Sequence, residues 1–402
     1  MKLLRILLMI AAVWSGWNSA LGRTWIQQTN APSETWHSIA SSADGSKLVA
    51  VNDNMYFNGH DFVFYGSIYT STNSGASWTQ ATNAPPAAWI AVTSSAGGNS
   101  LVALPADGPL YASRDSGTTW TPINTPSSFL DCIASSADGT KLAAGAWNDF
   151  VPTPSLIYTT TNSGATWATN NAPSEYWTSI ASSANGTKLV AVAVNPTTTG
   201  PIYTSVDSGI TWNVTSAPET NWYAVASSAD GVKLIAAVSG GQVYTSIDSG
   251  ANWTVTGLPS AAWDAVASSA DGTRLVAAEN YGGTIYTSTD SGVTWIQADV
   301  PAASWLSVAS SADGNKLVAV SFQGMIYASQ TLPSPRLNLT PLGANLVLSW
   351  VIPATNFVLQ QSSNLISWVN VTNTPTLNLT NLQKEVVLAP SNSSGFFRLS
   401  TP

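Results

Sequence analysis

One sequence unit recurs seven times along this chain of 402 residues, and the repeat restricts the possible folds more than any other feature. In the first copy it begins Trp36-His-Ser-Ile-Ala-Ser-Ser-Ala-Asp44-Gly45 and ends Ser71-Thr-Asn73-Ser-Gly-Ala-Ser-Trp78. Successive copies start 41 to 53 residues apart, which is the length of one four-stranded propeller blade. Each copy opens on a bulky apolar residue, namely Trp36, Trp89, Leu130, Trp177, Trp222, Trp263 and Trp305.

Turn signals divide each unit into four short strands. An Asp-Gly or Asn-Gly pair such as Asp44-Gly45 predicts a tight hairpin between the first two strands. The third strand ends at Ser-x-Asp/Asn-x-Gly-x-x-Trp, and the fourth strand starts at that Trp. Because β-branched and aromatic residues abound while Leu, Glu, Lys and Arg are scarce, the sequence predicts an all-β protein.

The two ends of the repeat region complement each other. The seventh unit stops at Ser329 without its last strand, and the missing strand lies near the N-terminus, where Gly22–Gln27 matches Gly292–Gln297. A ring closed in this way leaves no open sheet edge. We therefore predict a seven-bladed β-propeller over residues 23–331, closed by an N-terminal strand.

The remaining segments have different compositions. Residues 1–22 contain a basic start, a short apolar run and small residues, so we expect a signal peptide and export to the periplasm, cell surface or medium. The apolar run is too short for a transmembrane anchor. Residues 332–336 form a Pro-rich linker, and the short strands of 337–402 predict a small Ig- or fibronectin-like β-sandwich. Cys132 is single and occupies a slot that holds Ser or Ala elsewhere, which favours a buried small residue over a nucleophile.

The turn before the fourth strand resembles the Asp-box of BNR repeats. Four segments carry the full pattern, for example Ser113-Arg-Asp115-Ser-Gly117-Thr-Thr-Trp120, and Asn replaces Asp in two more. Such boxes belong to bacterial sialidases, some xyloglucan-cleaving glycosidases, sortilin-type receptors and the seven-bladed photosystem II assembly-factor family. The resemblance covers residues 23–329 and implies fold more than activity, because those families share the box and not the chemistry. It implies a structural role for Asn73, Asp115, Asn162, Asp207, Asp248 and Asp290.

Propeller geometry separates two faces. The Asp-Gly hairpins and the Asp-boxes share one face, called the turn face; the loops that precede each first strand and those between the second and third strands share the other, called the loop face. The loop face carries the long insertions, so it is the candidate ligand surface, with a possible ring of stacking aromatics. Regular repetition instead favours the opening tryptophans as core wedges between blades. The candidate ligand-binding residues are Trp36, Trp89, Trp177, Trp222, Trp263, Trp305, Trp147, Asp53, Tyr56, His60, Asp61 and Asp149.

Only 8% of the residues are charged, and the net charge is -8. Six cations occupy one repeat position after the Asp-Gly turn, so we expect no Lys or Arg on the loop face; they are Lys47, Lys141, Lys188, Lys233, Arg274 and Lys316. This distribution argues against nucleic-acid binding, which needs clustered cations, and against sialidase activity, which needs convergent arginines. We expect no metal and no cofactor, because His37 and His60 are not at ligand spacing and have no Cys partner.

Three functions fit these features. We expect an exported, monomeric, non-catalytic propeller that binds a neutral glycan, a peptide or a protein partner through an aromatic, cation-free face. The first alternative is a glycoside hydrolase on neutral polysaccharide, which needs two carboxylates about 5 to 10 Å apart. These would come from Asp53, Asp61 and Asp149, or from Asp131 and Asp264. The second alternative is a structural cell-surface or matrix component.

Overall fold

The structure is a computed structural model that describes the chain in segments. The expected signal peptide, residues 1–22, and the Pro-rich linker, residues 332–336, lie outside the described residues. The described residues are 23–57, 62–125, 127, 129–146, 156–169, 171–194, 199–330, 337–342, 345–351, 358–363, 367–378, 383–388 and 396–400. Every regular element among them is a β-strand, and the chain divides into two compact units, residues 1–330 and 331–402.

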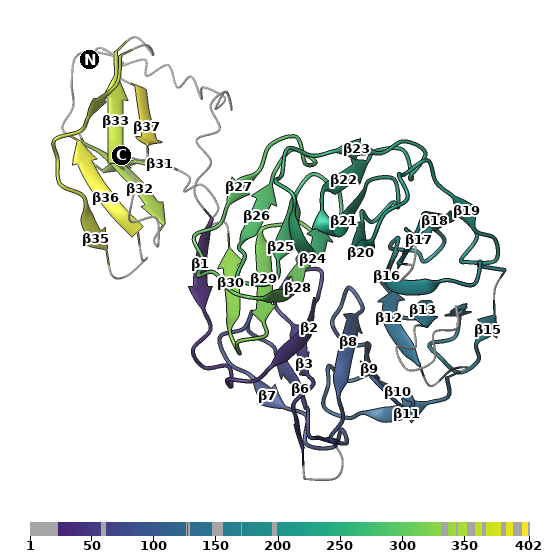
Figure 1. Cartoon of the computed structure of the whole chain (residues 1–402). Helices are drawn as coiled ribbons and strands as arrows, with labels where there is room; N and C mark the ends of the chain where they lie inside the picture. The colour runs from purple at the N-terminus through teal and green to yellow at the C-terminus, as the bar shows by residue number, and fades with distance from the viewer. Residues whose placement is uncertain are drawn as a thin grey trace. The chain divides into compact units, whose positions relative to one another are not determined.

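The first unit is a seven-bladed propeller (Figure 1). From the inside outward, blade 1 contains β2 (Trp36–Ser41), β3 (Leu48–Asn52), β6 (Ile68–Ser71) and β7 (Thr79–Gln80). Blade 2 contains β8 (Trp89–Ser94), β9 (Leu101–Pro105), β10 (Leu110–Ser113) and β11 (Thr121–Ile123). Blade 3 contains β12 (Leu130–Ser135), β13 (Leu142–Ala146), β14 (Ile157–Thr160) and β15 (Ala168–Thr169). Blade 4 contains β16 (Tyr176–Ser182), β17 (Leu189–Val194), β18 (Ile202–Ser205) and β19 (Asn213–Val214).

The other three blades repeat this order. Blade 5 contains β20 (Trp222–Ser227), β21 (Leu234–Gly241), β22 (Val243–Ser246) and β23 (Thr254–Val255). Blade 6 contains β24 (Ala261–Ser268), β25 (Leu275–Glu279), β26 (Ile285–Ser288) and β27 (Ile296–Gln297). Blade 7 contains β28 (Trp305–Ser310), β29 (Lys316–Ser321), β30 (Ile326–Gln330) and, as its outer strand, β1 (Thr24–Gln27). Blades 5 and 6 share one sheet, because the end of β21 pairs with the start of β24.

Two features close the ring. The N-terminal strand β1 pairs antiparallel with β30, with Trp25 opposite Ser329, and Figure 1 shows these two strands side by side. On the turn face, one backbone N–H of each blade donates to a carbonyl of the next blade over 2.7 to 2.8 Å. The N–H of blade 7 donates to the carbonyl of blade 1, so the series is closed. The residues of this closed ring are Ala43, Ala96, Ala137, Ala184, Ala229, Ala270 and Ala312. The predicted closure by an N-terminal strand is confirmed.

The core lies between neighbouring blades. Second strands such as β3 and β9 are buried along their whole length, which explains their continuous apolar sequences. One cluster joins Val49, Val51 and Ile68 of blade 1 to Trp89 and Leu101 of blade 2, and similar clusters fill the other seams. Cys132 is buried within the cluster between blades 3 and 4, and burial raises the pKa of its thiol, so the expected small core residue fits better than a nucleophile.

The turn between the third and fourth strands has one hydrogen-bond pattern, seen clearly in blade 2. The Ser113 hydroxyl donates to Asp115 over 2.8 Å and accepts from the Gly117 N–H over 2.8 Å. The Thr119 N–H and hydroxyl donate to the Asp115 carboxylate over 2.8 and 2.6 Å, and these bonds hold its pKa at about 2. The indole N–H of Trp120 donates to the Gly117 carbonyl over 3.0 Å. These residues therefore shape a turn, and Asn73 and Asn162 make the equivalent backbone bonds in their own turns.

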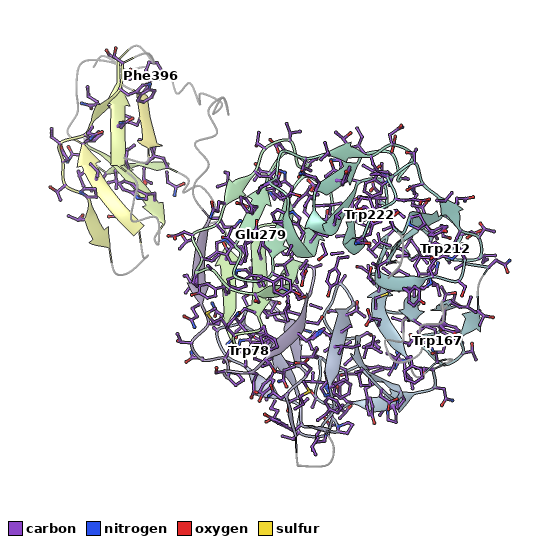
Figure 2. All side chains as sticks on the ribbon, in the orientation of Figure 1. Trp78, Trp167, Trp212, Trp222, Glu279 and Phe396 are labelled. Atoms are coloured by element: carbon purple, nitrogen blue, oxygen red, sulfur yellow. The ribbon has the colours of Figure 1, made fainter. Side chains whose placement is uncertain are left out.

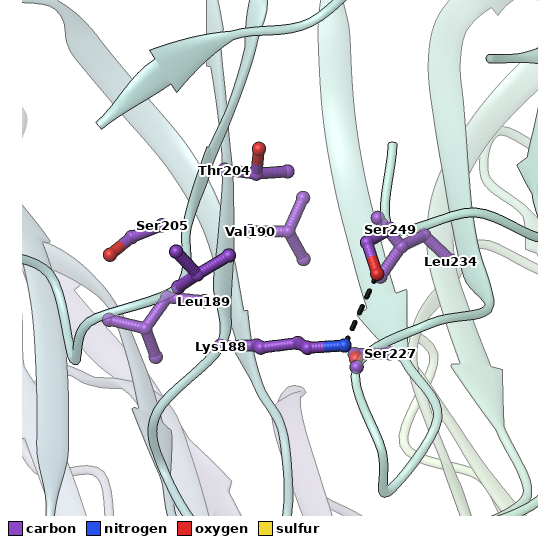
Figure 3. Close-up of a pocket in the computed structure, with 10 residues that line it drawn as sticks. Lys188, Leu189, Val190, Thr204, Ser205, Ser227, Leu234 and Ser249 are labelled. Carbon is purple, nitrogen blue, oxygen red and sulfur yellow. Dashed lines mark hydrogen bonds between the residues drawn. The ribbon is translucent and has the colours of Figure 1, made fainter. Parts of the chain in front are cut away.

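The repeated cations of the turn face connect adjacent blades. Lys188 of blade 4 donates to the Ser249 hydroxyl of blade 5 over 3.3 Å, as Figure 3 shows in the crevice between these blades. Its stem crosses the Gly231 hairpin turn, where φ is +66° and an added Cβ would lie 2.7 Å from the Lys188 Cβ. Glycine is required there by both the backbone conformation and the space. These lysines therefore belong to the scaffold.

The second unit is a small β-sandwich, described here by itself. One sheet contains β31 (Asn338–Leu342), β32 (Asn345–Val351), β36 (Gln383–Leu388) and β35 (Thr376–Asn378). The other contains β34 (Val369–Asn370), β33 (Val358–Ser362) and β37 (Phe396–Ser400). Leu348, Trp350, Leu359 and Val386 form a buried cluster that draws on both sheets.

Candidate functional site on the loop face

The six opening tryptophans lie in the core and do not form a binding platform. Each has a relative exposure of 0%. Each also packs edge-on against the tyrosine of its blade's third strand, with ring centroids 5.2 to 5.7 Å apart. Figure 2 shows Trp222 nearer the axis of the ring than Trp167 and Trp212. A side chain without exposed surface offers no face to a ligand, so ligand stacking is corrected to inter-blade packing for Trp36, Trp89, Trp177, Trp222, Trp263 and Trp305.

Two of the candidate residues on the insertions, Asp53 and Tyr56, belong to the described part of the chain. Asp53 is half-buried at the end of the second strand of blade 1. The insertion then forms a hairpin of β4 (Met55–Phe57), which contains Tyr56, and β5 (Phe62–Phe64). His60, Asp61, Trp147 and Asp149 lie outside the described residues.

A β-bulge follows the opening residue of every blade. In blade 1, Trp36 pairs with Asn52 and Ser38 pairs with Val51, so His37 is left out of the ladder, and the other six blades have the same register shift. A bulge releases one side chain from the pleat and re-aims it. None of the seven residues left out of the ladder is buried. We call these residues the bulge ring: His37, Ile90, Asp131, Thr178, Tyr223, Asp264 and Leu306.

The bulge ring differs in chemistry from blade to blade, while the positions around it repeat. Two members contact the backbone of the next blade: His37 Nδ1 lies 2.7 Å from the Ile90 carbonyl oxygen, and the Thr178 hydroxyl donates to the Trp222 carbonyl over 3.0 Å. Tyr223 is 41% exposed. Because the fold does not impose one residue type there, these positions are candidates for ligand recognition.

The pKa of the Asp264 carboxyl, a member of the bulge ring, is strongly shifted. Burial raises its pKa to about 6, although a hydrogen bond from the Asn280 side-chain amide opposes the shift. The side-chain oxygen Oδ1 of Asn280 in turn accepts from the Tyr281 N–H over 2.7 Å. The Asn280 side-chain amide therefore fixes both the half-buried Asp264 carboxyl and the next turn.

That turn presents an aromatic ring in a strained backbone conformation. Tyr281 has φ +53°, which is rare for a bulky residue, and its side chain is 82% exposed. Such strain persists only where surrounding contacts impose it, and it concentrates at functional sites. Asn280 supplies these contacts through its side chain and through its N–H, which donates to the Ala262 carbonyl.

Exposed aromatic side chains of the propeller gather on the loop face. Phe64 and Tyr65 lie at the end of the insertion of blade 1, Phe129 precedes β12, and Phe322 lies in the turn between β29 and β30. With Tyr223 and Tyr281, their exposures range from 41% to 82%. None of these residues is among the candidate ligand-binding residues predicted from the sequence, because the repeated tryptophans formed the more conspicuous aromatic pattern. The signal that points to Tyr223 is a column of the repeat in which the residue type varies between blades. We call the six the exposed aromatics: Phe64, Tyr65, Phe129, Tyr223, Tyr281 and Phe322.

Charge separates the two faces. Residues 23–330 contain eight Lys and Arg, and all eight belong to the turn-face hairpins or outer turns. The turn face also holds the nine aspartates of these turns, which offset its cations. The loop face carries carboxylates without cations: Glu34, Asp53, Asp107, Asp131, Glu175, Glu219, Asp264, Glu279 and Asp299. The expected cation-free face is thus present in the part of the chain that the structure describes. Within that part, no three His, Cys, Asp or Glu side chains are grouped to hold a metal ion, and no helix is long and apolar enough to cross a membrane.

We expect the Asp264→Asn variant to be more stable than the parent at neutral pH. A carboxyl whose folded pKa is raised to about 6 favours the fold while it is protonated, and this contribution is lost as pH rises from about 4 to 6. After allowance for partial solvent screening, the gain should be about 1 kcal/mol at pH 7.5 and should vanish near pH 4. Thermal unfolding at both pH values measures it. The exposed carboxyl of Asp299 gives the control, Asp299→Asn, and an equal gain at both pH values would contradict the assignment.

Comparisons with known proteins agree with the architecture. A family model described as the DUF6242 beta propeller domain matches residues 24–179. Among solved structures, YCF48 bound to D1 peptide is similar at a TM-score of 0.56 and 16% identity, with 77% of this chain and 97% of that chain covered. YCF48 from Cyanidioschyzon merolae is similar at 0.55 and 15%, with 76% and 98% covered. No curated protein matches the sequence. The chain therefore has a β-propeller fold like that of YCF48, a photosystem II assembly factor.

Proposed function

We propose that this protein is a non-catalytic binding propeller whose loop face holds an extended polypeptide segment of a partner protein. The observation that carries the proposal is the gathering of the exposed aromatics on this one face. Exposed aromatic side chains supply large contact areas at a low cost in side-chain entropy, which is why interfaces are enriched in them. A similar propeller, YCF48, has been solved with a bound peptide, which supports a polypeptide over a glycan.

The chemistry of the site also favours binding. Asp264, with its pKa of about 6, is suited to proton donation near neutral pH. Glycoside hydrolysis additionally needs a second carboxylate of the protein, about 5 to 10 Å from the first, that acts on the same glycosidic bond. The exposed aromatics, by contrast, need no further group to contact a ligand.

A random dodecapeptide library displayed on phage and selected on the full chain tests the proposal. Enriched peptides are then labelled, and their affinity is measured by fluorescence anisotropy. We expect the triple variant Tyr223→Ala, Tyr281→Ala, Phe322→Ala to weaken binding at least about tenfold, since central aromatic residues typically carry 1 to 2 kcal/mol or more each.

The matched control changes three exposed aliphatic residues of the turn face: Val206→Ala, Ile247→Ala and Val293→Ala, which are 63%, 69% and 76% exposed. Their effect should stay within about twofold. The proposal of a polypeptide partner would be refuted if binding of the enriched peptides depended on the turn-face residues. It would also be refuted if the protein bound only neutral glycans on a glycan array.

We further propose that residues 1–22 direct export and that the six outer turns are Asp-boxes. The basic and apolar pattern of the N-terminus supports the first proposal, and mass spectrometry of the N-terminus of the exported chain tests it. The shared hydrogen bonds of Asp115, Asp207, Asp248 and Asp290 support the second. Both concern how the propeller is delivered and built.

A further inference from the structure

We propose that the loop face of blades 5 and 6 seats a lysine or arginine side chain of the partner, which makes the partner segment a basic peptide. This inference rests on the proposed function and specifies the chemistry of the ligand. The proposed site consists of Asp264 and Asn280 with Tyr223 and Tyr281 on the neighbouring bulge and turn. We refer to these four residues as the cation seat.

The carboxylate is the first element of the cation seat. Asp264 comes from the bulge of β24 and is held by the Asn280 amide, which is itself fixed through the Tyr281 N–H. A half-buried carboxylate held in one position gains more from a cationic partner than a solvated one, because less solvent screens the pair. Residues 23–330 contain no Lys or Arg on this face that would neutralise it.

The aromatic rings are the second element. Tyr223 takes the bulge position of blade 5, next to that of Asp264 in blade 6, and the two blades form one continuous sheet through the pairing of Ser239 with Ala262. Tyr281 follows Asn280 directly and is 82% exposed. Tyrosine faces attract ammonium and guanidinium groups and also cover the apolar stem of a lysine.

The charge of the whole face is the third element. Nine carboxylates lie on the loop face, while all eight cations of residues 23–330 lie on the turn face. A positively charged segment is therefore attracted to the loop face, where no cation offsets the carboxylates, and this attraction weakens as salt rises. The turn face has no comparable excess of charge, because nine aspartates of its hairpins and outer turns accompany the eight cations. Charge complementarity selects a basic segment over a neutral or acidic one.

Two defined peptides test the cation seat on the full chain. The probes are fluorescein-labelled (Gly-Lys-Leu)4 and its counterpart (Gly-Glu-Leu)4, which have equal length and apolar content. At 20 mM NaCl we expect saturable binding of the lysine peptide, at least about tenfold weaker binding of the glutamate peptide, and at least about tenfold weakening of the first at 300 mM NaCl. Equal binding of the two peptides, or no saturable binding of the lysine peptide, overturns the inference.

Variants separate the cation seat from general attraction to an acidic face. Asp264→Asn should weaken binding of the lysine peptide about tenfold, while Asp299→Asn, which removes the same charge at an exposed position, should change it less than twofold. Unchanged binding by Asp264→Asn overturns the inference. Peptides enriched from the random library distinguish the two proposals. If their binding depends on the exposed aromatics but they contain no excess of Lys and Arg, the proposed function stands and the cation seat is overturned. If no enriched peptide depends on the exposed aromatics, both proposals are overturned.

Discussion

A chain that starts at Thr29, and so lacks β1, is expected to lose about 5 kcal/mol or more of unfolding free energy and to associate through blade 7. The deletion removes the four-residue pairing with β30 and the buried Trp25, which is 7% exposed. Loss of a buried tryptophan costs about 3 to 5 kcal/mol, and each lost hydrogen bond adds about 1 kcal/mol. Urea unfolding followed by tryptophan fluorescence measures the first effect, and light scattering measures the second.

Exposure of β30 as a new sheet edge is the physical reason for the expected association. A synthetic peptide of residues 22–28 should therefore restore a large part of the lost stability, and a peptide with Trp25 replaced by Ser should restore much less. Removal of residues 331–402, the other compact unit, provides a deletion control that should leave the unfolding of the propeller unchanged. If the chain without β1 unfolds like the full chain, the ring is not closed by this strand.

Trp222→Ala is expected to destabilise the propeller by about 3 to 5 kcal/mol, the usual cost of truncating a buried tryptophan. Trp222 is fully buried against Val190, Val192 and Ile202 of blade 4, and its indole N–H donates to the Pro218 carbonyl over 3.2 Å. Its ring lies 5.2 Å from that of Tyr244, so the variant leaves a cavity at the seam of two blades. Chemical unfolding measures the change in midpoint.

The contrast with Tyr281→Ala makes this test specific. Tyr281 is 82% exposed, and its replacement should change stability by less than about 0.5 kcal/mol while weakening peptide binding. A Trp222→Ala variant that folds as stably as the parent and loses only ligand binding would restore the stacking interpretation of the opening tryptophans.

Repetition made the scaffold predictable. The Asp-Gly pairs, the outer turns and the split seventh unit each required one structural solution in every blade, so strand order and closure followed from spacing alone. The burial of the tryptophans followed from the same regularity, because a residue needed in each seam performs the same packing in each. The cation-free face was also predictable, since Lys47 and its equivalents share one position beside the hairpin turn.

The binding surface was harder to predict because its residues do not repeat. Tyr281 and Phe322 lie in turns of different blades that no common pattern connects, and exposure depends on how each turn is shaped. The bulges could not be predicted for another reason. An extra residue in a strand shifts the alternation of buried and exposed positions, and the sequence pattern does not show at which residue the pairing register shifts. Asp264 was named as a candidate carboxylate, yet its contact with Asn280 depends on that break.

The bulge ring also has an evolutionary consequence. Seven positions, one in each blade, project from the rigid inner strands but make no ladder pairing, so replacing them leaves the hydrogen bonds of the sheet intact. Duplicated blades can then keep one scaffold sequence and still acquire seven independent side chains at a shared surface. Randomising these seven positions would therefore vary a set of surface side chains without remodelling a loop, which makes them the natural choice for a binder engineered on this scaffold.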